Sequence, residues 1–204
     1  MASAAFQLAR QHDRILTIGH SNHSWAKFLE LLQSSGVEVV VDARSHPYSK
    51  FCPQFDFEAL KKSLSEAGIR YVPLGNQLGG RPKGNEFYDS DGHVLYDRVA
   101  ASESFRLGVE RLKKGVDGYV VALMCGEEDP AGCHRRSLIG RVLREAGYIV
   151  DHIRGDGRIQ PDHELDSVVP DVPQLSLFEE VQVPAWKSIP SVSLKRRQSS
   201  SSAF

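Results

Sequence analysis

Two cysteines lie in a short segment that also carries a histidine, two arginines and three carboxylates. Residues 125–136 read Cys-Gly-Glu-Glu-Asp-Pro-Ala-Gly-Cys-His-Arg-Arg, so His134 and Arg135 directly follow the second cysteine, Cys133. A thiolate is both a nucleophile and a metal ligand, and neighbouring cations or a helix N-terminus lower the pKa of a thiol. The segment joins an apolar run to a helical pattern, and the backbone N–H groups at such a helix start favour an anion.

Three interpretations of these cysteines follow from the residue types. In the first, Cys125, or with less support Cys133, is a nucleophile with His134 or His20 as its base. In the second, Cys125, Cys133 and His134 bind zinc, which takes three or four nitrogen and sulfur ligands, although this spacing matches no standard zinc motif. In the third, Cys125 is a small buried side chain at a strand end, and Cys133 and His134 cap a helix. The sequence leaves all three open.

Other reactive and charged side chains follow the apolar runs of the chain, at the point where each run ends. Ligands of open α/β sheets bind outside the carboxyl ends of the strands, so we expect these side chains to meet at one edge. Polar loops and a structural Asp42–Arg44 pair would give the same pattern. The expected catalytic residues are His20, Asp42, Cys125 and Glu127. The residues expected to bind an anionic group are Ser21, Arg44, His134, Arg135 and Asp156.

Several familiar phosphate-binding motifs are absent from the sequence. A phosphatase loop that starts at Cys125 would place arginine at position 131, where this chain has alanine. The glycines of the sequence lack the spacing and context of a dinucleotide-binding fingerprint, and no Walker A sequence is present. A phosphate could instead be held by Arg44, Arg135 and the start of the helix after Cys133, since the planar fork of arginine suits phosphate or carboxylate.

The elements that would position these side chains are five apolar runs that alternate with helical patterns. The runs cover residues 14–19, 37–41, 69–72, 119–124 and 148–153, and we expect each to be a buried strand. The helical patterns cover residues 25–34, 56–67, 99–114 and 133–146. This alternation predicts a three-layer α/β/α sandwich with a mostly parallel five-stranded sheet.

Composition narrows the class of protein. The 204 residues suit one domain with extensions, and the formal net charge of −1 gives no global basic field for nucleic acid or membrane. No apolar run approaches the length of a membrane span, and the first residues do not resemble a signal peptide. Three cysteines, an odd number, favour a reducing compartment over a disulfide scaffold. We therefore expect a cytoplasmic protein.

Three parts of the chain are expected. Residues 1–13 form an N-terminal extension and residues 14–169 form the α/β domain. From residue 170 onward prolines interrupt the chain, helical or strand periodicity is lost and the end is rich in serine. We expect residues 170–204 to be a largely disordered tail.

The motifs of the domain resemble the domain of unknown function 488 family over about residues 15–165. The matching segments are Thr17-Ile-Gly-His-Ser21, Asp42-x-Arg44 with Pro47 and Ser49, Leu74-Gly75, Cys125-x-Glu127-x-x-Pro130-x-x-Cys133-His134-Arg135, and Val150-x-His152-Ile153 with Asp156-Gly157. The resemblance implies the α/β/α sandwich. It implies no activity, because the family is named for having none assigned.

A pentapeptide in the tail resembles the motif by which bacterial replication and repair proteins dock on the sliding clamp. It is the segment Gln174-Leu175-Ser176-Leu177-Phe178. Leu177 and Phe178 would fill an apolar groove, and Gln174 would supply hydrogen bonds. The alternative is that this segment folds back and covers an apolar patch of the domain.

These observations support two hypotheses about function. The first is an enzyme that acts on a phosphate-bearing substrate, a nucleotide or nucleic acid, and that the tail recruits to DNA replication or repair. The second is a non-catalytic adaptor whose cysteines bind a metal, with zinc as the candidate, or respond to oxidation.

Overall fold

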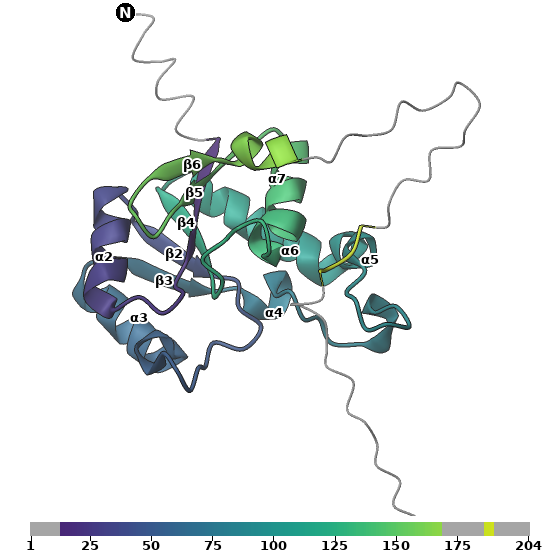
Figure 1. Cartoon of the computed structure of the whole chain (residues 1–204), viewed down its shortest axis with the longest axis horizontal. Helices are drawn as coiled ribbons and strands as arrows, with labels where there is room; N and C mark the ends of the chain where they lie inside the picture. Colours follow the sequence, from purple (N-terminus) through teal and green to yellow (C-terminus); the bar gives the residue numbers. More distant parts are fainter. Residues whose placement is uncertain (1–12, 169–185, 190–204) are drawn as a thin grey trace, which may run out of the picture.

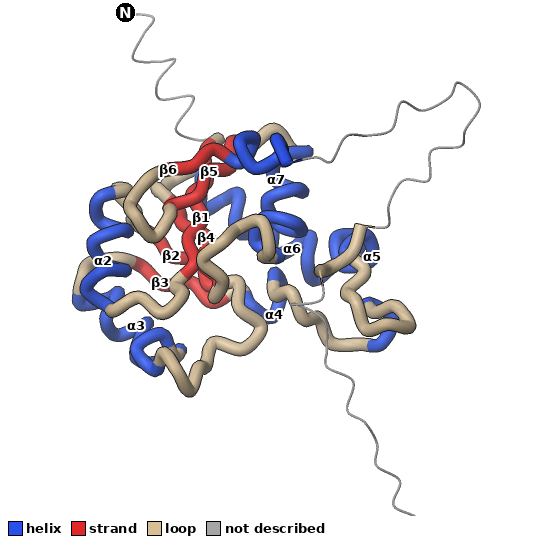
Figure 2. Tube along the Cα trace, in the orientation of Figure 1, coloured by secondary structure: helices blue, strands red, loops and turns tan. Residues whose placement is uncertain are grey.

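The computed structural model describes residues 13–168 and 186–189. One six-stranded sheet runs through its centre in the order β3-β2-β4-β1-β5-β6 (Figures 1 and 2). The strands are β1 (Arg14–Gly19), β2 (Val39–Asp42), β3 (Arg70–Pro73), β4 (Val121–Cys125), β5 (Ile149–Ile153) and β6 (Ile159–Pro161). The first five are parallel, as predicted, and β6 pairs with β5 in the antiparallel sense.

Helices cover both faces of the sheet and complete the predicted sandwich (Figure 1). On one face, α2 (Trp25–Ser34) and α3 (Phe57–Glu66) bury apolar residues such as Phe28 and Leu60 against Val40 and Ala122. On the other face, α6 (Glu103–Val116) and α7 (Arg141–Glu145) pack against Val41 and other strand residues. Neighbouring residues of a strand point to opposite faces, so each central strand supplies both cores.

Three local features differ from the sequence-based expectation. The helix expected at 99–114 is two helices, α5 (Tyr96–Ala101) and α6, because Ser102 caps α6 by accepting a hydrogen bond from the Phe105 N–H. The helix expected at 133–146 begins as a π-helical segment, Arg135–Gly140, that continues into α7. The sixth strand was not expected, since its three residues, Ile-Gln-Pro, are too few to form an apolar run.

Shorter helical turns occupy the connections of the sheet. After β3 come α4 (Gly75–Leu78) and a 3₁₀ turn at Asn85–Phe87, within the long glycine-rich connection. Further 3₁₀ segments lie at Pro53–Phe55, before α3, and at Asp162–Val168, after β6. Within the described ranges, no helix is both long enough and apolar enough to cross a membrane.

Four residues of the expected tail, 186–189, pack on the domain. The Trp186 indole donates a 2.7 Å hydrogen bond to the Ser137 carbonyl and lies against the Tyr96 ring and the Arg141 guanidinium. Ser188 is buried and exchanges hydrogen bonds with Val94. The expected disorder therefore does not extend to 186–189. The candidate clamp peptide at 174–178 and most of the extension at 1–13 lie outside the described residues.

Candidate functional site

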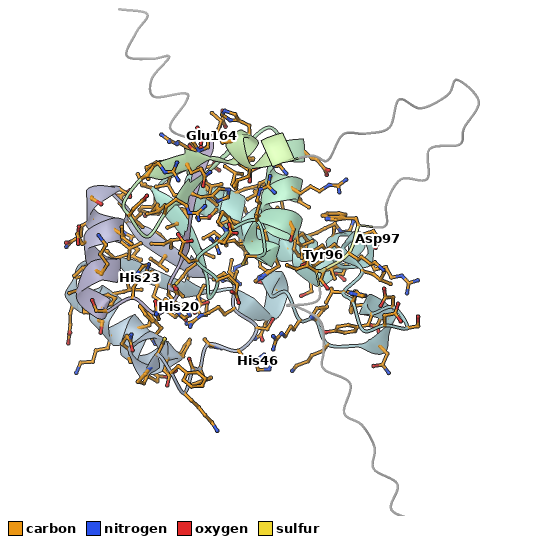
Figure 3. The ribbon with its side chains drawn as sticks, viewed as in Figure 1. His20, His23, His46, Tyr96, Asp97 and Glu164 are labelled. Carbon is orange, nitrogen blue, oxygen red and sulfur yellow. The ribbon has the colours of Figure 1, made fainter. Side chains whose placement is uncertain are left out.

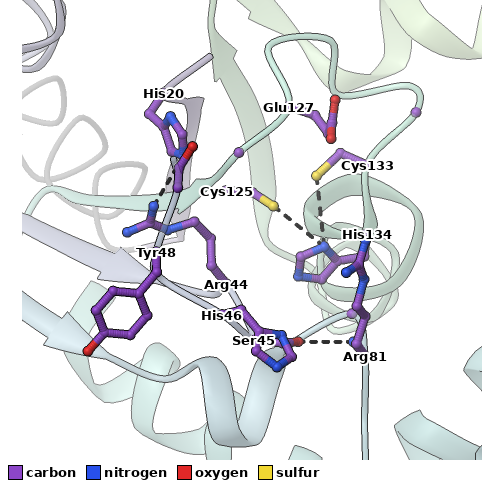
Figure 4. A pocket seen from close by; sticks show the side chains of 14 residues that line it. His20, Arg44, Ser45, His46, Tyr48, Arg81, Cys125, Glu127, Cys133 and His134 are labelled. Atoms are coloured by element: carbon purple, nitrogen blue, oxygen red, sulfur yellow. Dashed lines mark hydrogen bonds between the residues drawn. The ribbon is translucent and has the colours of Figure 1, made fainter. Parts of the chain in front are cut away.

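A pocket of about 230 Å³ opens at the carboxyl ends of three central strands (Figure 4). His20 follows β1, Arg44 and His46 follow β2, and Cys125 ends β4 (His20 and His46 are also labelled in Figure 3). The lining is completed by the loop after α4 and by the start of the π-helical segment. Its residues are His20, Arg44, Ser45, His46, Tyr48, Ser49, Gly80, Arg81, Cys125, Gly126, Glu127, Gly132, Cys133 and His134.

Cys125, Cys133 and His134 form a compact cluster on one wall of the pocket. His134 Nδ1 lies 3.6 Å from Cys125 Sγ and 3.9 Å from Cys133 Sγ. The other ring nitrogen, Nε2, lies 3.2 Å from the Ala43 carbonyl oxygen, to which it can only donate. In neutral His134 the Nδ1 lone pair therefore faces the two sulfur atoms. All three side chains are buried.

The two thiols perturb each other. The hydrogen bond from Cys125 to Cys133 is the main cause that raises the pKa of Cys125 and lowers the pKa of Cys133. Burial further raises the pKa of Cys125, whereas His134 and Arg135 further lower that of Cys133. Of the two thiols, Cys133, the cysteine that precedes the helix, is therefore the one whose environment favours the thiolate.

Arg44 is held rigidly by a buried carboxylate. Its Nε and Nη2 atoms donate to both oxygens of Asp42 over 2.7–3.2 Å, and Nη2 also donates to the Phe55 carbonyl. Burial alone would lower the pKa of Arg44, but the hydrogen bonds and charge of Asp42 outweigh it and raise that pKa. Tyr71 donates its hydroxyl hydrogen to the same carboxylate over 2.7 Å. Asp42 thus orients a permanent cation and does not line the pocket.

His20 is a neutral side chain beside that cation. Its Nδ1–H donates to the Ser21 carbonyl over 2.8 Å, and Nε2 accepts from Arg44 Nη1 over 3.1 Å. Burial, together with the charge of Arg44, lowers the pKa of His20 to about 4. The ring also stacks on Phe55, with 4.5 Å between centroids. His20 is therefore an uncharged base at neutral pH, with its Nε2 lone pair already occupied.

Arg135 stabilises the loop that follows Cys125 by binding its backbone carbonyls. Its side chain is completely buried and donates to the carbonyls of Glu127 and Glu128 and to the Thr17 hydroxyl. These contacts fix the backbone between Cys125 and the helix. Arg135 is not among the residues that line the pocket, so its geometry fits loop positioning rather than anion binding.

The structure brings together most, but not all, of the residues that the sequence singled out. Those that line the pocket are His20, Arg44, Cys125, Glu127, Cys133 and His134. Those that do not are Ser21, Asp42, Arg135 and Asp156. The Ser21 hydroxyl contacts Asn22, and Asp156 lies in the turn between β5 and β6, where it accepts the Arg158 N–H.

Sequence reasoning missed one wall of the pocket, the loop that carries Gly80 and Arg81. Arg81 is exposed, and no carboxylate of residues 13–168 or 186–189 lies within ion-pair distance of it. A Cβ atom on Gly80 would lie 2.7 Å from His134 Cγ, so only glycine allows this loop to approach the cluster. The glycine-rich composition of residues 73–97 was the available signal.

The protein is thus an α/β/α sandwich with a cysteine–histidine cluster and an oriented arginine at its strand ends. The chain matches the family model "Domain of unknown function DUF488" over residues 24–142, more than half of its length. The chain belongs to this family. Comparisons with curated proteins and with solved structures find no match.

Proposed function

We propose that the protein is an enzyme whose pocket binds the phosphate group of a nucleotide or nucleic acid. The observation that carries this proposal is the hydrogen-bond pattern of Arg44. A guanidinium has five N–H donors. Four of them are directed to Asp42, Phe55 and His20, and one Nη1 N–H has no partner among the described residues. It belongs to a group that lines the pocket. A buried cation with one available donor favours an anionic ligand.

Further cationic groups around the pocket support an anionic substrate. Arg81 lines the pocket and is not neutralised by a described carboxylate, whereas the charge of Arg44 is largely offset by Asp42. The helix that starts after Cys133 directs the positive end of its dipole toward the same place. A volume of about 230 Å³ suits a phosphate with part of a nucleoside rather than a long polymer segment.

Glu127 supplies the acid–base group of the proposed site. Its exposed side chain lines the pocket and points toward the cysteines in Figure 4. The neighbouring Glu128 is instead paired with Arg154 over 2.8 Å. Glu127 is therefore the carboxylate of this loop that is placed to exchange a proton with a bound substrate or water.

Calorimetric titration of the full-length protein with nucleoside monophosphates, and with the matching nucleosides, tests the phosphate site. We expect binding of the monophosphates and at least about tenfold weaker binding of the nucleosides, which lack the charged acceptor. Arg81→Gln should weaken monophosphate binding by about tenfold, the loss of one charge-assisted contact. Arg106→Gln, at an exposed position of α6, is the matched control. Equal affinity for nucleoside and monophosphate would refute the phosphate site.

We propose that residues 174–178 recruit this enzyme to the bacterial sliding clamp. The support is the sequence Gln-Leu-Ser-Leu-Phe, which lies between two parts of the described structure that end at Val168 and resume at Trp186. Micromolar binding of the full-length protein to a sliding clamp, lost in a variant with Leu177→Ala and Phe178→Ala, is the expected result. If the unmodified chain does not bind the clamp, the proposed recruitment to replication and repair is wrong.

A further inference from the structure

We propose that Cys125, Cys133 and His134 bind one zinc ion, with the fourth coordination position open to the pocket. The metal site rests on the geometry of the three side chains. Its participation in chemistry rests on the proposed function.

The distances within the cluster match those of a tetrahedral zinc site. Zinc–sulfur bonds of about 2.3 Å and zinc–nitrogen bonds of about 2.05 Å, at tetrahedral angles, place sulfur and nitrogen about 3.6 Å apart. The observed separations are 3.6 Å for Cys125 and 3.9 Å for Cys133, both to the same atom, His134 Nδ1. All three donor atoms lie within 4.8 Å of one another. Both sulfur–nitrogen separations are therefore close to those of a tetrahedral site.

The His134 ring is oriented as a metal ligand requires. A ligating histidine usually donates its second N–H to a carbonyl or carboxylate, which fixes the tautomer and the ring plane. Here Nε2 donates to the Ala43 carbonyl, so Nδ1 keeps its lone pair toward the two sulfur atoms. The single lone pair of His134 Nδ1 can accept a linear hydrogen bond from only one S–H group, yet both sulfur atoms lie close to it. A shared cation explains this convergence better than a hydrogen bond to one thiol.

Charge and burial also favour a dication in this cluster. Two thiolates and one neutral imidazole carry two negative charges, which one Zn²⁺ ion neutralises. A neutral assembly avoids the cost of isolated charge in a buried site, and the three side chains are at most 7% exposed.

The open position lies toward the pocket because the three residues that supply the ligands all line it. Three protein ligands with one open position is the arrangement of catalytic rather than structural zinc sites. A water molecule bound there would have a pKa near 7. Glu127, which lines the same pocket, would be the carboxylate placed to accept a proton beside such a site.

A second group of potential metal ligands lies among the described residues, but its side chains are already used in hydrogen bonds and an ion pair. Asp89, Asp91 and His93 also come close together. However, Asp89 accepts the backbone N–H groups of Asp91 and His93 and pairs with Lys187 over 3.1 Å. This group is a hydrogen-bonded turn.

Metal analysis of the full-length, untagged protein tests the proposal. After expression with zinc and dialysis against a weak chelator, we expect about one zinc ion per chain. Cys133→Ser should reduce the zinc content at least about tenfold, consistent with loss of one of three ligands. Cys52→Ser is the control, because Cys52 is also buried but bonds to the Ser21 carbonyl, outside the cluster.

Cobalt substitution of the unmodified chain gives a readout that does not depend on the folding of variants. Bound Co²⁺ should show the visible absorption of a tetrahedral, thiolate-ligated ion. If the purified chain contains no zinc and the addition of Co²⁺ gives no such spectrum, the proposal is overturned. Arg81→Gln should keep the metal, because Arg81 is not one of the three ligands. If the unmodified chain binds zinc but not nucleoside monophosphates, the proposed phosphate site is wrong and the metal site stands.

Discussion

Arg44 donates a 3.1 Å hydrogen bond from Nη1 to His20 Nε2, and this contact joins the ends of two strands that are not neighbours. Arg44 follows β2 and His20 follows β1, while β4 lies between them in the sheet and ends in Cys125. The pair thus passes over the central strand beside the cysteine. It also requires His20 to be neutral, in agreement with its low pKa.

Replacing Arg44 by lysine should damage the site even though the charge is kept. Lysine cannot reproduce the two-pronged contact with Asp42, nor reach the Phe55 carbonyl and His20 at the same time. We expect a loss of about 1–3 kcal/mol in the free energy of unfolding and at least about tenfold weaker binding of nucleoside monophosphates. Urea denaturation and calorimetry measure the two effects, with Arg106→Lys as the control. Unchanged binding would show that the fork of Arg44 does not contact the ligand.

Gly80→Ala should disturb the cluster without removing any reactive group. The added Cβ would lie 2.7 Å from His134 Cγ and so push the ring away from the sulfur atoms. We expect at least about tenfold lower affinity for both metal and nucleoside monophosphate, by analogy with the loss of a supporting contact. Gly118→Ala is the matched control, because its Cβ would meet nothing within 4 Å. If both substitutions lower the affinities equally, the close approach of Gly80 to the His134 ring is not what supports the cluster.

Trp186→Ala should destabilise the domain although the residue lies far along the chain. It removes the hydrogen bond to Ser137, the ring contact with Tyr96 and the cation–π contact with Arg141 at 4.3 Å. We expect the free energy of unfolding to fall by about 2 kcal/mol. Lys187→Ala removes only the ion pair of a neighbouring exposed side chain with Asp89, so it should change the free energy of unfolding by less than about 1 kcal/mol. Identical denaturation curves for Trp186→Ala and the unmodified chain would show that 186–189 contribute nothing to stability.

Asp162→Asn should be most harmful at neutral pH and least harmful in acid. Asp162 accepts hydrogen bonds from His152 and Arg136, each over 2.9 Å, and pairs with Arg144 over 2.8 Å. Burial would raise its pKa, but these partners outweigh burial and lower it. The ionised carboxylate therefore stabilises the fold above its unfolded pKa of about 3.9, and this contribution is lost as the pH falls further.

The expected cost of Asp162→Asn at pH 7 is about 3 kcal/mol, typical of breaking a buried ion pair. The difference between the two proteins should shrink below about pH 4. Urea denaturation between pH 7 and pH 3 measures both quantities. A difference that stays constant or grows in acid would mean that the carboxylate is not ionised in the folded protein.

The sheet was predictable because five of its strands are parallel and mostly buried on both faces, which gives continuous apolar runs such as that of β4. Helix ends were predictable where glycine takes a positive φ, as at Gly36 and Gly68. The break at Ser102 was not predictable, because apolar residues continue on both sides of it.

The site was predictable only in part. Strand ends identified Cys125 and Arg44, but which side chains line a pocket depends on packing, and Asp42 and Arg135 do not line this one. Arg81 escaped notice because it reaches the site through a contact with Ser45, 36 residues earlier. Such long-range contacts leave no periodic pattern in the sequence.

A crystal structure of the full-length protein with a bound nucleoside monophosphate tests the central claim most directly. The account predicts a phosphate oxygen within about 3 Å of Arg44 Nη1, with Arg81 on the opposite side of the phosphate. A nucleotide bound elsewhere on the protein, with no part of it in the pocket between Arg44 and His134, would contradict it.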